Sequence, residues 1–236
     1  MSKRDLSLAT RNEHTRNEKE VVLPIQFSRI QIKKHFDDNL DEIKKQFNLA
    51  NVLIEKDDIV GCEMIWRSQM VFSEALLDFY LHEISKYCMF KMFCNNWEKT
   101  ERYKNFMIPM FSVDKALSMN DSKGWFFELL TKRFSREVFL SAESMKDQLN
   151  LIGLGFTKVM TKAFPERKEG DSVKNGRKTI EDLFKRRNEI VHQNDRSHID
   201  AEQNSISEEQ VKCYINKIEC IVNAIDECVK ENDAKK

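Results

Sequence analysis

Arg187, Asn188 and His192 are the side chains whose types and spacing could carry out chemistry. A histidine exchanges its proton near neutral pH, and an arginine is a permanent cation that binds phosphate oxygens through paired hydrogen bonds. Asn188 and His192 are four residues apart, so a helix would put them on one side. The three side chains could therefore converge on a phosphate group.

The segment that must position these side chains runs from Thr179 to Asp195 and reads TIEDLFKRRNEIVHQND. Thr179, followed by Asp182, is a helix N-cap signal, after which apolar residues recur at helical spacing. These apolar residues are Ile180, Leu183, Phe184, Ile190 and Val191. At about 100° per residue they fill an arc of roughly 120°, and Arg187 falls near its middle.

The position of Arg187 within an apolar arc allows two interpretations. An unpaired charge in an apolar interface costs several kcal/mol, because a guanidinium does not lose its proton. In the first interpretation an Asp or Glu from another helix pairs with Arg187, and His192 merely borders the core. In the second, Arg187, Asn188 and His192 line a cleft that binds phosphate.

The motif Arg187-Asn188-x-x-x-His192 occurs late in a helical chain, after a long hydrophobic helix, and resembles the R-N-x-x-x-H signature of the HEPN superfamily. Residues 75–86, ALLDFYLHEISK, resemble the early core helix of the RiboL-PSP type of HEPN domain. KRRNEIVHQNDR followed by ISEEQV resembles its last two helices. The resemblance covers residues 58–229 and implies an all-α, HEPN-like helical bundle around a long hydrophobic central helix.

The activity expected from these residues is RNA cleavage without a metal ion or another cofactor. His192 would take the proton of the ribose 2′-OH or protonate the leaving 5′ oxygen, and Arg187 would stabilise charge on the phosphoryl oxygens. Asn188 would position the phosphate or the imidazole. The expected products are a 2′,3′-cyclic phosphate and a 5′-hydroxyl, and DNA should resist cleavage because it lacks the 2′-OH.

The resemblance also implies partners and a setting. In HEPN families two protomers pack with their motifs facing, which implies a homodimer with a composite active site. Such proteins are often toxins or effectors of prokaryotic defence against phage, which implies a regulatory partner or antitoxin in addition to RNA. The alternative is a non-catalytic HEPN module that binds nucleotide or a partner protein, and such a module should tolerate the loss of His192.

Three further polar residues are candidates to support the motif. Glu74, Asp78 and His82 follow one line along the long hydrophobic helix expected from Ile59 to about Phe93. In the functional interpretation, one of the acids faces Arg187 or orients His192 across the bundle. In the other, these residues are exposed or satisfied locally.

The stretch from residue 165 to residue 187 is locally basic and is a candidate RNA contact. Residues 165–178 are predicted to form a polar loop that leads into the motif helix. The candidate RNA-binding residues are Lys174, Arg177, Lys178, Lys185 and Arg186. A loop that is merely solvated fits the same pattern.

Composition restricts the class of protein. The 236 residues include only 6 Gly and 3 Pro, typical of a helical chain, and Lys plus Arg equals Asp plus Glu at 39 each. A neutral chain gives no reason to expect indiscriminate nucleic-acid binding. Six cysteines without a C-x-x-C pair indicate reduced thiols in a cytoplasmic protein. The sequence shows no run able to span a membrane and no secretory signal.

Four units are expected along the chain. Residues 1–20 are predicted to be a flexible arm, residues 21–57 an amphipathic helical extension, residues 58–230 the HEPN-like domain and residues 231–236 a frayed tail.

Within the HEPN-like domain the sequence predicts the bounds of two helices and no metal site. One helix is expected from Ser141 to Phe164, running through two glycines whose small size would allow close helix packing. A capping box at residues 207–210 should begin the final helix. No metal site is expected, because the polar residues after the motif match no standard ligand spacing. Those residues are His192, Asp195, His198 and Asp200.

Overall fold

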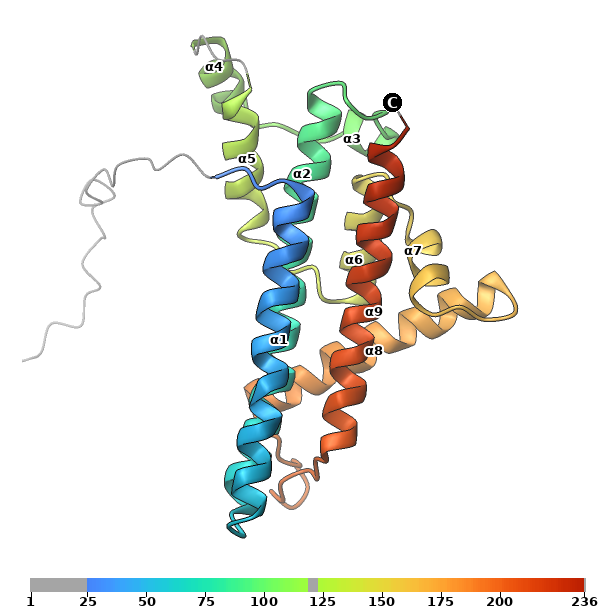
Figure 1. Ribbon diagram of the computed structural model, residues 1–236. Helices are drawn as coiled ribbons and strands as arrows, with labels where there is room; N and C mark the ends of the chain where they lie inside the picture. Colours follow the sequence, from blue (N-terminus) through green and yellow to red (C-terminus); the bar gives the residue numbers. More distant parts are fainter. Residues whose placement is uncertain (1–24, 119–122, 236) are drawn as a thin grey trace, which may run out of the picture.

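The computed structural model describes residues 25–118 and 123–235, and within these ranges the chain forms α-helices and no β-strand beyond one isolated bridge (Figure 1). The helices are α1 (Arg29–Ile54), α2 (Ile59–Phe93), α3 (Glu101–Lys104), α4 (Met110–Ser118), α5 (Gly124–Phe134), α6 (Ala142–Leu151), α7 (Phe156–Ala163), α8 (Glu169–Gln193) and α9 (Glu208–Asp233). The all-α fold expected from the sequence is confirmed. The predicted arm of residues 1–20 lies outside the described residues.

α2 is the central helix of the fold. It is 35 residues long and apolar on most sides, and it carries buried residues from Cys62 to Met92. The Asp58 carboxylate accepts a hydrogen bond from the Gly61 amide at 2.8 Å and caps its first turn. α1 runs beside α2 and α9 packs on both (Figure 1). α1 buries Ile32, Phe36 and Leu40 in the core, so its amphipathic pattern faces α2 and α9.

The stretch between Ser141 and Phe164 contains two helices, so the prediction of one continuous helix is wrong. Gly153 and Gly155 both have positive φ, at 78° and 73°, a conformation that glycine adopts without steric cost. The Leu154 amide donates to the Leu149 carbonyl, which closes a Schellman motif at the end of α6. The two glycines therefore serve a turn rather than close helix packing.

α8 begins at Glu169, so the predicted loop is wrong over residues 169–178. Its polar residues still favour a helix, because Glu and Lys are good helix formers and Glu169 and Asp171 in the first turn complement the helix dipole. Thr179 is buried within the helix instead of capping it. Gly176 permits the close approach of α7, since a Cβ there would lie 2.4 Å from the Met160 sulfur.

α9 begins with the predicted capping box, in which the Ser207 hydroxyl accepts from the Gln210 amide and the Gln210 side chain accepts from the Ser207 amide. The helix continues through Asp233, whose carboxylate accepts hydrogen bonds from the Tyr87 hydroxyl at 2.9 Å and the Trp97 indole at 3.1 Å. The chain is therefore helical past Lys230. No helix in the described ranges is long and apolar enough to span a membrane.

Candidate active site

The motif residues lie on the C-terminal half of α8, on a face that the rest of the chain leaves partly open. Arg187 and Asn188 are half-buried and His192 is exposed. Nη1 of Arg187 donates to Oδ1 of Asn188 at 2.9 Å. Of the five apolar residues in the predicted arc, only Ile180 and Leu183 are buried, and Val191 is 44% exposed. The buried arc therefore ends before the motif.

Arg187 makes no ion pair with any described carboxylate. Its neighbour, Arg186, instead donates two hydrogen bonds to Asp195, which follows the C-terminal end of α8 itself and does not lie on another helix. A half-buried guanidinium without a bound carboxylate is costly unless an anion reaches it. Arg187 is thus placed to receive a phosphate.

Of the three supporting candidates, Glu74 is the one that interacts electrostatically with the motif. It is buried under α8, and the charge of Arg187 lowers its pKa. The Tyr214 hydroxyl lies 2.7 Å from Glu74 Oε2 and 3.0 Å from the Leu183 carbonyl, and its single proton serves one acceptor at a time. Burial raises the pKa of Glu74 to about 7, against the Tyr214 hydrogen bond and the Arg187 charge, which lower it. A carboxyl that is partly protonated near neutral pH leaves Arg187 incompletely neutralised.

Asp78 and His82 have their polar partners elsewhere. His82 Nε2 lies 3.6 Å from Asp78 Oδ2, and Asp78 Oδ1 accepts from the Phe139 amide at 3.2 Å. The His82 ring packs on the Phe139 ring at 4.6 Å between centroids. These two residues fasten the segment before α6 to α2, and the structure does not bring them to Arg187 or His192 by any contact.

Asp195 and Arg67 form a buried ionic cluster that the sequence analysis missed. Asp195 is fully buried, and its Oδ2 accepts from Arg67 Nε at 2.7 Å and from Arg186 Nη2 at 2.9 Å. Its Oδ1 accepts from Arg186 Nη1 and from Asn204 Nδ2, the latter at 3.1 Å. Burial raises the pKa of Asp195, but the hydrogen bonds from Arg186, Asn204 and Arg67 outweigh it, so the pKa lies below its ordinary value.

The candidate RNA-binding residues divide into paired and unpaired cations. Arg186 is bound to Asp195, and Arg177 is bound to Glu143. Lys185 is mostly exposed, with Glu189 3.9 Å away. Lys174 and Lys178 are exposed and form no ion pair within the described part of the chain. Lys174 and Lys178 therefore have charge available to an RNA backbone, whereas the Lys185 charge is shared with Glu189.

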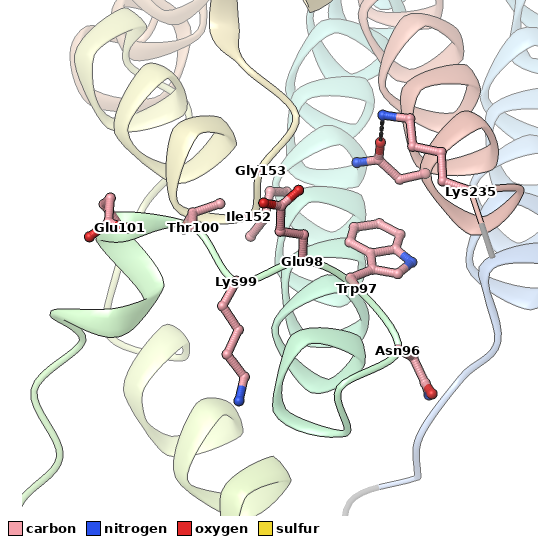
Figure 2. A pocket seen from close by; sticks show the side chains of 10 residues that line it. Asn96, Trp97, Glu98, Lys99, Thr100, Glu101, Ile152, Gly153 and Lys235 are labelled. Atoms are coloured by element: carbon pink, nitrogen blue, oxygen red, sulfur yellow. Dashed lines mark hydrogen bonds between the residues drawn. The ribbon is translucent and has the colours of Figure 1, made fainter.

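Two hollows in the surface lie outside the open face that carries the motif. One of about 330 Å³ lies on the other flank of α8, where Arg186 and Glu189 face Tyr214 of α9. Another of about 450 Å³ lies where the loop after α2 meets Gly153 (Figure 2). Figure 2 shows Trp97, Glu98 and Lys99 around it, and its lining has no histidine or cysteine. It therefore lacks an acid-base group that titrates near neutral pH.

The possible metal ligands remain apart within the described residues. There, no three His, Cys, Asp or Glu side chains are grouped so that they could hold a metal ion. The six cysteines are free thiols, of which Cys62, Cys88 and Cys228 are buried.

The family model RiboL-PSP-HEPN matches residues 27–231, most of the chain, and the protein therefore belongs to this family. The match includes α1 as well as the helices that follow. No curated protein and no solved structure matches the chain. Since HEPN domains are commonly ribonucleases, the family points to a ribonuclease or a nucleotide-related function.

Proposed function

We propose that this HEPN protein is a metal-independent endoribonuclease. In this reaction His192 accepts the proton of a ribose 2′-OH, the 2′ oxygen attacks the adjacent phosphorus, and the bond to the 5′ oxygen breaks. The leaving 5′ oxygen takes a proton from a second acid. The products are a 2′,3′-cyclic phosphate and a 5′-hydroxyl end, and no metal ion enters the reaction.

The observation that carries the proposal is the state of Arg187. It is half-buried, it has no described carboxylate within ion-pair distance, and it shares the open face of α8 with an exposed histidine. A fixed cation in a partly desolvated site stabilises charge that develops on phosphoryl oxygens much better than a hydrated one does. Asn188 accepts a hydrogen bond from Nη1, which orients the guanidinium so that its other N–H groups can meet the phosphate.

An apolar stripe on α2 supports the proposal that two copies combine. The stripe follows one face of the helix and consists of Val60, Met64, Phe72 and Phe79, which are 46 to 79% exposed. Ala75 continues the same face and is also exposed. Contiguous exposed apolar surface usually marks an interface.

The stripe lies beside the part of α2 that contacts α8, so a second copy packed on it would approach the motif face. Glu74, next to Ala75 in the chain, is buried under α8. Val191, on α8, is also an exposed apolar residue, at 44% exposure. In such a homodimer, one copy of His192 would act as base and the other as acid, while the two Arg187 side chains bind the phosphate.

The proposed setting, a toxin or antiviral effector held by a regulatory partner or antitoxin, follows from the family resemblance. Expression of wild type against His192→Ala in a bacterial host tests it. Growth arrest by the wild type alone supports a toxin, and equal growth of both strains contradicts one.

The experiment that tests the activity is cleavage of total RNA by purified protein in EDTA. We expect wild type to cut and His192→Ala to lose about 10² to 10⁴-fold in rate, the usual contribution of general acid-base catalysis. His198→Ala is the matched control, because His198 is also exposed and lies six residues further along the chain. Equal activity of His192→Ala and His198→Ala would refute the proposal.

A further inference from the structure

Asp195 is a buried charge that the proposed reaction does not use, although it lies three residues after His192. Its carboxylate is fully buried between two guanidiniums, with Arg67 on α2 and Arg186 on α8. Two cations around one carboxylate form a cross-link between helices whose geometry is fixed by directional hydrogen bonds. The cross-link joins the end of the motif helix to the central helix of the fold.

The backbone around Asp195 is fixed by the same cluster. Asn194 and Asp195 have φ values of 52° and 54°, and the Asp195 amide donates to the Glu189 carbonyl at 3.0 Å. The Asp195 carbonyl accepts from the Asn204 amide at 2.8 Å, and the Asn204 carbonyl accepts from Arg67 Nη2, also at 2.8 Å. The last turn of α8 and the following loop are therefore tied to each other and to α2.

A helix end needs such ties, because its last carbonyls have no partner within the helix and the final turn frays. His192 lies in that final turn, whereas Arg187 lies more than one turn earlier, one helical turn after the buried Leu183. Fraying would therefore move the imidazole and leave the guanidinium in place. A displacement of about 1 Å between catalytic groups can cost about 10²-fold in rate.

We propose that Asp195 is a positioning residue for the ribonuclease reaction, which holds the last turn of α8 so that His192 stays in register with Arg187. The inference rests on the proposed function. It assigns to the Arg67–Asp195–Arg186 cluster a role in kcat besides its contribution to folding.

The test compares Asp195→Asn with Asp226→Asn. Asp226 also receives two hydrogen bonds from an arginine, Arg29, at 2.8 and 2.7 Å, but it joins α9 to α1 away from the motif. We expect Asp195→Asn to lower kcat by about 10²-fold with KM changed by less than about threefold, because RNA binding does not require the aligned imidazole. Asp226→Asn should keep kcat within about twofold. Equal kcat losses in both variants would overturn the proposal.

Hydrogen exchange supplies a readout that does not depend on activity. In Asp195→Asn we expect the backbone amides of residues 190–193 to exchange at least about tenfold faster, while amides in the centre of α9 are unchanged. Unchanged exchange at the end of α8 would overturn the proposal. If the wild type itself cuts no RNA, the proposed function fails, and the exchange measurement still decides whether Asp195 holds the last turn.

A milder variant covers the case in which Asp195→Asn does not fold. Asn204→Ala removes the 3.1 Å hydrogen bond to Asp195 Oδ1 and leaves both arginines in place. We expect it to fold, to lower kcat about threefold and to speed exchange at residues 190–193. A folded Asn204→Ala protein with wild-type kcat and wild-type exchange would overturn the proposal.

Discussion

Arg186 and Arg187 are adjacent in the chain and have opposite environments. The rotation of about 100° per residue in a helix turns Arg186 towards the buried Asp195 and Arg187 towards the open face of α8. Arg186 is neutralised by a carboxylate, so its charge is used within the fold. Within the described ranges Arg187 donates a hydrogen bond only to the Asn188 amide oxygen, so its charge remains available. The comparison teaches that each cation of a basic motif must first be classified as paired with a carboxylate or unpaired. Only then can a function be assigned to it.

Substituting the two arginines is expected to have the largest effects, on different quantities. Arg187→Ala should lower the cleavage rate by about 10² to 10³-fold, as the loss of a fixed electrostatic stabiliser does. The free energy of unfolding should change by less than about 1 kcal/mol, because no ion pair is broken. Cleavage kinetics and urea unfolding measure both quantities.

Arg186→Ala provides the control for this pair. It leaves Asp195 with one cation fewer, so the free energy of unfolding should fall by about 3 kcal/mol. The cleavage rate of the folded fraction should fall by less than about tenfold, because Arg67 still holds the Asp195 carboxylate and the Asn204 carbonyl. A larger loss of activity in Arg186→Ala than in Arg187→Ala would break the comparison.

The cleavage rate at the open face of α8 should also depend on the binding of a second copy of the chain. Phe72 is 55% exposed on the α2 stripe, and Phe72→Asp would put a charge into the proposed interface. We expect this variant to sediment as a monomer and to cut RNA at least about tenfold more slowly. The control is Leu49→Asp, because Leu49 is 60% exposed on α1. Identical sedimentation of the two variants and wild type would contradict the proposed homodimer.

Glu74 sharpens the comparison, because it is the buried acid that senses Arg187. Its pKa in the fold, about 7, exceeds the ordinary 4.5, so the folded state holds a proton that the unfolded chain releases. The bound proton of Glu74 stabilises the fold fully below about pH 4, and this stabilisation is lost as pH rises through 7. The free energy of unfolding should therefore fall by about 2 to 3 kcal/mol between pH 5 and pH 8.

Glu74→Gln should remove this decline and keep an acceptor for the Tyr214 hydroxyl. Urea unfolding of both proteins at pH 5 and pH 8 measures it, and the variant should gain on wild type at the higher pH. A difference between the two proteins that is the same at both pH values would contradict the assignment.

The smallest expected effect is on RNA affinity. It should differ between paired and unpaired cations in the part of α8 that precedes the motif. Lys174→Ala should weaken RNA binding a few-fold and reduce the slope of log affinity against log salt by about one. Arg177→Ala should leave the slope nearly unchanged, because Glu143 already neutralises Arg177. Filter binding at several salt concentrations measures this, and equal slopes for the two variants would show that the pairing is irrelevant to RNA contact.

The sequence allowed local features to be predicted where the signal lies within one turn. The capping box at Ser207 is such a feature. The hydrophobic character of α2 could be predicted for a different reason, because its apolar pattern extends over a long helix. The start of α8 is not visible in the sequence because all but one of the side chains in its first ten residues, that of Val173, are polar or absent, and polarity alone does not distinguish an exposed helix from a loop.

The Asp195 cluster could not be predicted from spacing. Arg67 and Asp195 are 128 residues apart, and their contact depends on how α8 crosses α2. The one signal in the sequence is that Asp195 follows a helix that carries two adjacent arginines, Arg186 and Arg187, without an evident partner. Which arginine it would meet is decided by tertiary packing, so the sequence left both interpretations of Arg187 open.

The measurement that tests the central claim most directly uses a short RNA that carries a single 2′-deoxy nucleotide at a mapped cleavage site, in EDTA. We expect the all-RNA substrate to give a 2′,3′-cyclic phosphate and a 5′-hydroxyl, and the substituted one to remain intact at that position. Cleavage of the 2′-deoxy position at an equal rate, or cleavage only after Mg²⁺ is added, would contradict catalysis by Arg187 and His192.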